Sequence, residues 1–350
     1  MKSRLSNIEL LRFIAMLMVL LLHANYASIG VVSIVDVHTN TLPSIVRMLF
    51  EFICIGAVNV FVLISGWFGI KASVKGAFSL IFQVIFFSVL IVGCFALFNR
   101  DITYISIRNL FPLYYMYWFI AAYLILYALS PVLNIFAANA TKIQMMVVVV
   151  CFFVLEIFYG FLTDMGKFIG GYSAISFIGL YLLARLIRLH SIKLVNISFI
   201  RNLLLYALFT IIPVVIVFMG DNWSVRVFSS TTYNSPFVVL ASMFLFLAFA
   251  KLNFNSRVIN WLAASSFAIY VIHSHPLIFP YYQKIVLAIY SDVSVFTYII
   301  GIICLSIIVG LICVIVDQFR IATWKWLCTL FLDKFLYLAE KSFIKLVEKL

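Results

Sequence analysis

Arg12 and His23 are the residues of this chain whose types and spacing best suit chemistry, because both interrupt an apolar run. The run, residues 9–25, reads ELLRFIAMLMVLLLHAN. On an α-helix the two residues are about 16 Å apart along the axis, and their side chains project within roughly 20° of each other, on one face. An imidazole exchanges protons near neutral pH, and a guanidinium binds anions. Both groups are costly in hydrocarbon, so we expect them to face a cavity inside the protein.

A plainer interpretation of the same two residues stays open. The Arg12 side chain can extend to the lipid headgroups, and His23 can serve only as a hydrogen-bonding group between packed helices. Glu9 lies three residues before Arg12, which is the spacing of a helical ion pair, and is expected to orient the guanidinium.

Further polar residues occur in other apolar runs. Ser266 and His273 are seven residues apart and share one helical face in the stretch that contains IYVIHSHPLIF. Glu156 has no partner nearby in sequence, so we expect it to line a cavity. Glu51 follows Arg47 by four residues, and the expectation there is a local ion pair.

The stretch VNVFVLISGWFG contains Asn59 and Trp67, two candidates for lining a cavity. Its small residues permit close approach of a neighbouring helix. Lys71 and Lys75 follow directly and would meet either an anionic ligand or lipid phosphates. Trp118 belongs to the densest aromatic run, residues 111–134, with Tyr114, Tyr115 and Tyr117. We expect this run to form either an interfacial belt or an opening that binds sugar rings, and in the second case Trp118 is a cavity candidate.

The elements that must position these groups are membrane helices. The chain is 66% hydrophobic and 10% charged, which excludes an ordinary soluble domain and predicts an all-α polytopic membrane protein. About ten transmembrane helices are expected, near 9–29, 46–69, 77–98, 112–129, 144–162, 171–189, 203–219, 236–251, 262–282 and 294–316.

Charge placement predicts the topology. About three quarters of the 24 lysine and arginine residues fall in alternate connections if the N-terminus is cytoplasmic, so both termini are predicted to be cytoplasmic. This bias explains the net charge of +12 without a nucleic-acid partner. The six cysteines have no metal-like spacing, so neither a disulfide framework nor a metal site is expected. Residues 317–350 are basic and amphipathic, which predicts a cytoplasmic interfacial helix.

Four ordered motifs together resemble one known family. They are the Arg12 to His23 spacing, FVLISGWF at 61–68, YWFIAAYLILYALSPVLN at 117–134 and AIYVIHSHPLIF at 268–279. The chain resembles the acyltransferase 3 family, the bacterial membrane polysaccharide and lipopolysaccharide O-acetyltransferases, over about residues 5–316. On this basis, residues 1–316 are expected to form a membrane acyltransferase domain in a bacterial inner membrane.

The resemblance implies transfer of an acetyl or other acyl group from cytoplasmic acyl-CoA to a hydroxyl of a surface glycan or its lipid-linked precursor. Arg12 and His23 match the family's functional arginine and histidine. The family's basic pair after the second span is often Arg-x-x-Arg, whereas this chain has Lys71 and Lys75, four residues apart.

The residues and the resemblance together predict one mechanism. His23 acts as general base on the sugar hydroxyl, or forms an acyl-histidine. Acetyl-CoA is a co-substrate, and its phosphates meet Arg12 and further cations, for which Lys71, Lys75, Arg185 and Arg188 are candidates. Asn59, Ser266 and His273 are candidate oxyanion donors. A transporter or flippase for a lipid-linked sugar is the main alternative, and a membrane-embedded sensor or interaction protein is another.

Overall fold

The computed structural model describes residues 5–99, 117–163, 168–220, 232–291 and 293–335, and these residues form helices and no strand. Seven helical segments among them are long and apolar enough to cross a bilayer: Ser6–Ser28, Thr41–Phe68, Val74–Phe98, Trp118–Asn139, Lys142–Leu162, Phe199–Met219 and Val295–Phe331. The prediction of an all-α multi-pass membrane protein is therefore confirmed. The count of about ten crossings and the cytoplasmic placement of the termini stay predictions.

Three expected spans fall in regions where the structure has shorter helices. Two of them, near 171–189 and 236–251, are α9 (Ala174–Leu189) and α12 (Pro236–Ala250). The third, 262–282, differs from expectation because it is divided among α13 (Arg257–Ala264), α14 (Ser266–His273) and α15 (Phe279–Tyr290). Ser265 separates the first two helices. Pro276 follows the end of α14, and because proline has no backbone N–H it cannot donate the hydrogen bond that would continue the helix.

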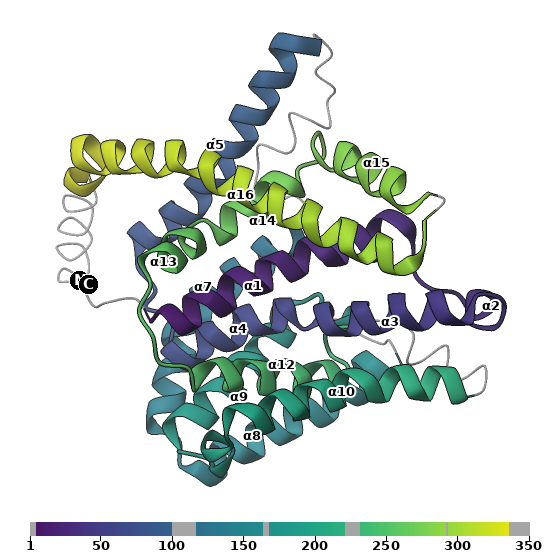
Figure 1. The fold of residues 1–350 in the computed structure, drawn as a ribbon. Coiled ribbons are helices and arrows are strands. Elements are labelled where there is room, and N and C mark those ends of the chain that lie inside the picture. The colour runs from purple at the N-terminus through teal and green to yellow at the C-terminus, as the bar shows by residue number, and fades with distance from the viewer. Residues whose placement is uncertain (1–4, 100–116, 164–167, 221–231, 292, 336–350) are drawn as a thin grey trace.

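The first helix, α1 (Ser6–Leu22), runs through the middle of the bundle (Figure 1). It contacts α3 (Thr41–Ile55), α4 (Ala57–Phe68), α12, α13, α14 and α16 (Val295–Leu327). A π-helix, η1 (His23–Ser28), continues α1 directly. The residue expected to do chemistry therefore lies where the central helix changes its winding, a feature often found at functional sites.

The remaining described helices surround this centre. They are α2 (Ile34–Thr39), α5 (Val74–Asn99), α7 (Trp118–Asn139), α8 (Lys142–Leu155), α10 (Phe199–Met219), the π-helix η3 (Glu156–Leu162) and the short 3₁₀ helices η4 (Ile169–Gly171) and η5 (Lys193–Asn196). Among the closest pairs are α10 with α12, and α9 with both α4 and α7.

The contact between α4 and α9 depends on a missing side chain. A Cβ atom on Gly66 would lie 2.5 Å from the Tyr181 carbonyl oxygen and 2.9 Å from the Ala184 Cβ. Only glycine permits this approach, so the expectation that small residues in ISGW allow close helix packing is confirmed.

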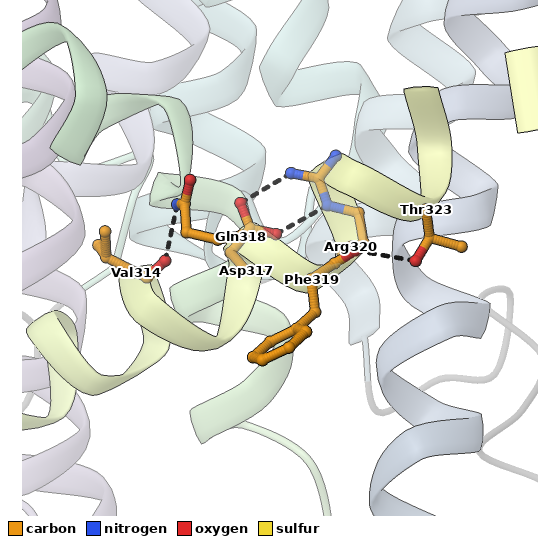
Figure 2. A network of polar contacts seen from close by, with 6 residues as sticks. All are labelled: Val314, Asp317, Gln318, Phe319, Arg320 and Thr323. Atoms are coloured by element: carbon orange, nitrogen blue, oxygen red, sulfur yellow. Dashed lines mark hydrogen bonds and ion pairs between the residues drawn. The ribbon is translucent and has the colours of Figure 1, made fainter. Parts of the chain in front are cut away.

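Helix α16 continues past residue 317, where the interfacial segment was expected to begin, and leads into the π-helix η6 (Cys328–Leu332). Asp317 is fully buried and Arg320 nearly so, and the guanidinium donates Nε and Nη2 hydrogen bonds of 2.7 Å to the two carboxylate oxygens (Figure 2). Beyond this pair, Trp324 packs against Phe82 of α5 at a ring-centroid distance of 5.0 Å. Residues 336–350 of the predicted interfacial helix lie outside the described residues.

Candidate active site

His23 is the first residue of η1, and its side chain is partly exposed to a cavity inside the bundle. The hydroxyl of Ser28, five residues later, donates a 2.7 Å hydrogen bond to the His23 carbonyl oxygen. The two residues are five apart, the same separation that backbone hydrogen bonds join in a π-helix. The backbone at His23 is thus held by the segment that follows it.

A second histidine, which is buried, lies against the His23 ring. His273 is the last residue of α14 and is 1% exposed. Its Nε2 lies 2.8 Å from His23 Nδ1, while its own Nδ1 lies 2.6 Å from the Ile269 carbonyl oxygen. The two rings come from helices 250 positions apart in the chain, so the fold alone brings them together.

The His23 cavity offers about 30 Å³ to the centre of a water molecule. Its walls come from α1, α4, α7, α14 and the turn before α12, and its other lining residues are Met16, Val19, Val58, Phe61, Trp118, Phe119, Tyr233 and Tyr270. Trp118, predicted as a cavity residue, therefore lies in the same cavity as His23. Tyr114 and Tyr115 of the same aromatic run lie outside the described residues.

The Arg12 cavity is larger, about 240 Å³ on the same measure. Its lining residues are Arg12, Met16, Phe61, Ser65, Leu80, Phe119, Tyr123, Ala263, Ala264, Ser266 and Phe267. Met16, Phe61 and Phe119 line both cavities, so the two are neighbours that share one set of walls. The two predicted residues thus line neighbouring cavities along α1.

Arg12 is about one-third exposed and its Nη1 donates a 2.9 Å hydrogen bond to Glu9 Oε1. The expected ion pair between these residues is therefore present. One carboxylate bond leaves other guanidinium N–H groups that can meet an anionic ligand in the Arg12 cavity. Ser266 lines the same cavity, and its hydroxyl has no hydrogen-bond partner among the residues that the structure describes.

The other predicted cations lie outside both cavities. Lys71 is exposed, and Lys75 Nζ lies 2.6 Å from Asp333 Oδ1 near the end of η6. A Cβ on Gly69 would lie 3.0 Å from Arg185 Nη1, so this guanidinium packs at the end of α4. Arg188 lies over the Trp67 ring at 4.8 Å.

Three predicted cavity residues take other positions. The Asn59 amide donates a 2.8 Å hydrogen bond to the carbonyl oxygen of Tyr233. This bond holds the turn that places the Tyr233 side chain in the wall of the His23 cavity. Trp67 is buried against Phe246. Glu156 is 1% exposed and begins η3, outside both cavities.

Sequence reasoning missed the bridge between Arg47 and Glu51. Asn25 donates to Glu51 Oε2 at 3.0 Å and accepts from Arg47 Nε at 3.1 Å. The predicted pair is therefore joined through an amide of η1. Four aromatic residues that line the His23 cavity were also not predicted as site residues: Phe61, Phe119, Tyr233 and Tyr270. The one local signal was that Tyr270 lies three residues before His273 in IYVIH.

A comparison with protein families identifies most of the chain. A family model described as an acyltransferase domain, the acyltransferase 3 model, matches residues 5–316. No curated protein and no solved structure matches. The match covers both cavities and every predicted site residue.

Proposed function

Because this chain belongs to the acyltransferase 3 family of membrane proteins, we propose that it transfers an acyl group, normally acetyl, from cytoplasmic acyl-CoA to a sugar hydroxyl. The acceptor is a surface polysaccharide or its lipid-linked precursor at a bacterial inner membrane. The observation that carries the proposal is the pair of adjoining cavities, one with Arg12 and one with His23.

The Arg12 cavity suits the donor. Coenzyme A has phosphates at one end and a thioester at the end of a thin, mostly uncharged arm. The guanidinium of Arg12 meets a phosphate, and the Ser266 hydroxyl is available to the arm. Arg12 and His23 are about 16 Å apart along α1, a distance that an extended arm of this kind spans. Phe61 and Phe119 supply apolar walls along the way.

Further cations have a more peripheral role in this scheme. Lys71, Arg185 and Arg188 lie near the end of α4 and the end of α9. They would attract the polyanionic nucleotide before it reaches Arg12. Lys75 is already paired with Asp333 and contributes less.

His23 performs the acid-base step. Its imidazole takes the proton of the sugar hydroxyl while that oxygen attacks the thioester carbonyl. The carbon–oxygen bond forms, the carbon–sulfur bond breaks, and the proton passes to the departing thiolate to give free coenzyme A. Transfer through an acyl-histidine would use the same ring as nucleophile. None of the three candidate oxyanion donors is favoured. The Asn59 amide is hydrogen-bonded to the Tyr233 carbonyl oxygen, and His273 is paired with His23. Ser266 lies about 10 Å from His273 along the axis of α14 and lines the Arg12 cavity instead.

Two variants test the proposal in membrane vesicles that contain the natural acceptor. His23→Ala is expected to lower transfer of radiolabelled acetyl into glycan by about 10²–10⁴-fold without loss of acetyl-CoA binding. Arg12→Ala is expected to weaken acetyl-CoA binding by roughly 10–150-fold, because a hydrogen bond to a charged group contributes about 1.5–3 kcal/mol. His38→Ala and Arg201→Ala are matched controls at exposed positions. Full activity of the His23 variant would refute the assigned base.

The transporter alternative predicts a different result. A flippase for a lipid-linked sugar would move its substrate without consuming acyl-CoA. Release of free coenzyme A by the purified protein, dependent on added acceptor, therefore separates the two functions.

A further inference from the structure

We propose that His273 is the positioning residue for His23: its Nε2 accepts the hydrogen on His23 Nδ1 and so keeps the lone pair of His23 on Nε2, where the His23 cavity can use it. This inference rests on the proposed function and adds a second histidine to it. It starts from two contacts, the 2.8 Å separation of the rings and the 2.6 Å contact of His273 with a carbonyl oxygen.

The carbonyl contact fixes the hydrogen on His273. A backbone carbonyl oxygen only accepts hydrogen bonds, so His273 Nδ1 must donate to the oxygen of Ile269. A neutral imidazole has a single N–H, which leaves the lone pair of His273 on Nε2. That lone pair lies 2.8 Å from His23 Nδ1. His23 must therefore carry its own hydrogen on Nδ1, and its Nε2 is left unprotonated.

The residues around the two histidines stabilise this hydrogen-bonded arrangement. His273 is 1% exposed, so water has little access to compete for its nitrogens. The Phe279 ring packs nearly perpendicular to the His23 ring at a centroid distance of 5.6 Å and limits its rotation. His23 itself is partly exposed and lines the His23 cavity. With Nδ1 committed to His273, the nitrogen left for a substrate is Nε2.

The pair has a direct consequence for the proton transfer. When Nε2 of His23 takes the proton of the attacking hydroxyl, the ring becomes an imidazolium with Nδ1–H still directed at His273. The lone pair of His273 Nε2 accepts a hydrogen bond from this cation and so helps to stabilise it. The third member of a catalytic triad takes the same position beside its histidine, there as a carboxylate. The proton then leaves from Nε2 to the thiolate, and both rings return to their starting states.

The hydroxyl of Ser274 is a second neighbour of the same lone pair. It lies 3.3 Å from His273 Nε2, farther than His23 Nδ1. It can point its hydrogen at that nitrogen only as a longer, weaker bond. Ser274→Ala is therefore expected to leave acyl transfer within about threefold of the parent, less than a typical net hydrogen bond contributes.

Two substitutions at position 273 separate the two hydrogen bonds of the ring. In His273→Gln, an amide oxygen takes the place of Nε2 and still accepts from His23. In His273→Asn, the amide reaches the place of Nδ1, so the bond to Ile269 is kept and the acceptor for His23 is lost. We expect kcat to fall by about 10²–10⁴-fold in the Asn variant, and by roughly tenfold in the Gln variant. The KM for acetyl-CoA should not change in either.

A matched control lies two residues away. His275 is buried, and its Nδ1 accepts the Leu277 backbone N–H at 3.2 Å. An asparagine oxygen can accept the same hydrogen, so His275→Asn should keep near-parental activity. Equal losses at both positions would instead indicate a general packing effect and would overturn the positioning role.

A spectroscopic measurement reads the tautomer without any turnover. The full chain, with ¹⁵N-labelled histidine, is placed in lipid nanodiscs, and the His23 nitrogens are assigned by their loss in His23→Ala. The expected spectrum has a protonated Nδ1 and an unprotonated Nε2 on His23, unchanged in His273→Gln and changed in His273→Asn. A protonated Nε2 on His23 in the parent protein would overturn the inference.

The two measurements keep the two proposals apart. If the tautomer is as expected and the parent protein transfers no acyl group to the natural acceptor, the proposed function fails while the hydrogen-bonded pair of histidines stands. If the parent is active and the Gln and Asn variants lose kcat equally, only the positioning role fails. A much smaller loss of kcat in the Gln variant than in the Asn variant, with an active parent protein, supports both.

Discussion

Acyl-chain selectivity is the sharpest consequence of the small His23 cavity. The cavity offers about 30 Å³ to water centres, and one water needs about 10–15 Å³ on this measure. Room therefore exists for two or three small groups, such as the methyl and carbonyl of an acetyl thioester. A butyryl group adds two methylenes, and its tail must displace aromatic walls.

The size of the effect follows from how apolar pockets treat methylenes. One methylene changes discrimination by about 1–3 kcal/mol, which is roughly 10–200-fold in kcat/KM. We therefore expect butyryl-CoA to be used at least about 100-fold less efficiently than acetyl-CoA, with propionyl-CoA in between. Phe119→Ala removes a ring that lines both cavities, so the acetyl preference should fall by roughly tenfold or more.

The assay measures transfer of radiolabelled acetyl, propionyl or butyryl from coenzyme A into glycan, at low donor concentration, in vesicles that hold the natural acceptor. Phe209→Ala is the matched control, because this ring stacks on Phe244 at 5.7 Å outside both cavities. Equal efficiency with acetyl and butyryl donors in the parent protein would refute the reasoning from cavity size. So would identical acetyl preferences in the Phe119 and Phe209 variants.

The remaining predictions concern stability, read as thermal unfolding in detergent or nanodiscs. Gly66→Ala should destabilise by about 1–3 kcal/mol, because its methyl would meet a carbonyl oxygen, whereas Gly93→Ala, with open space around it, should be neutral or stabilising. Arg320→Ala should cost about 3–5 kcal/mol by leaving the fully buried Asp317 carboxylate unpaired. Lys75→Ala breaks a half-exposed pair and should cost less than about 1 kcal/mol. An Arg320 variant as stable as the Lys75 variant would contradict the account of the buried pair.

The sequence predicted those parts of the site that depend on local periodicity. Arg12 and His23 lie on one helix, so their common face followed from the α-helical repeat, and they line adjoining cavities. The Glu9 pair with Arg12 and the close approach at Gly66 are equally local and are confirmed. The family resemblance is confirmed over residues 5–316.

Contacts between distant segments could not be predicted in the same way. The pairing of His23 with His273 depends on how α14 packs beside α1, which no local pattern encodes. Arg188 turned out to lie over Trp67, because an aromatic face competes with a ligand for a cation. The division of residues 262–282 was missed because apolar content alone does not reveal a helix break at a serine pair.

The π-turn at His23 lets one helix serve two separate polar sites. A π-turn contains one more residue than an α-turn, so the chain after His23 is rotated by about a quarter of a turn relative to regular α-helix. On one side of this offset, Arg12 and His23 line the two cavities; on the other, Asn25 reaches Arg47 and Glu51. Deleting one residue between Ala24 and Ser28 would restore regular winding, and Asn25 and the imidazole could not both keep their partners. The extra residue thus rotates the following side chains, so that a single helix contributes to two different polar sites.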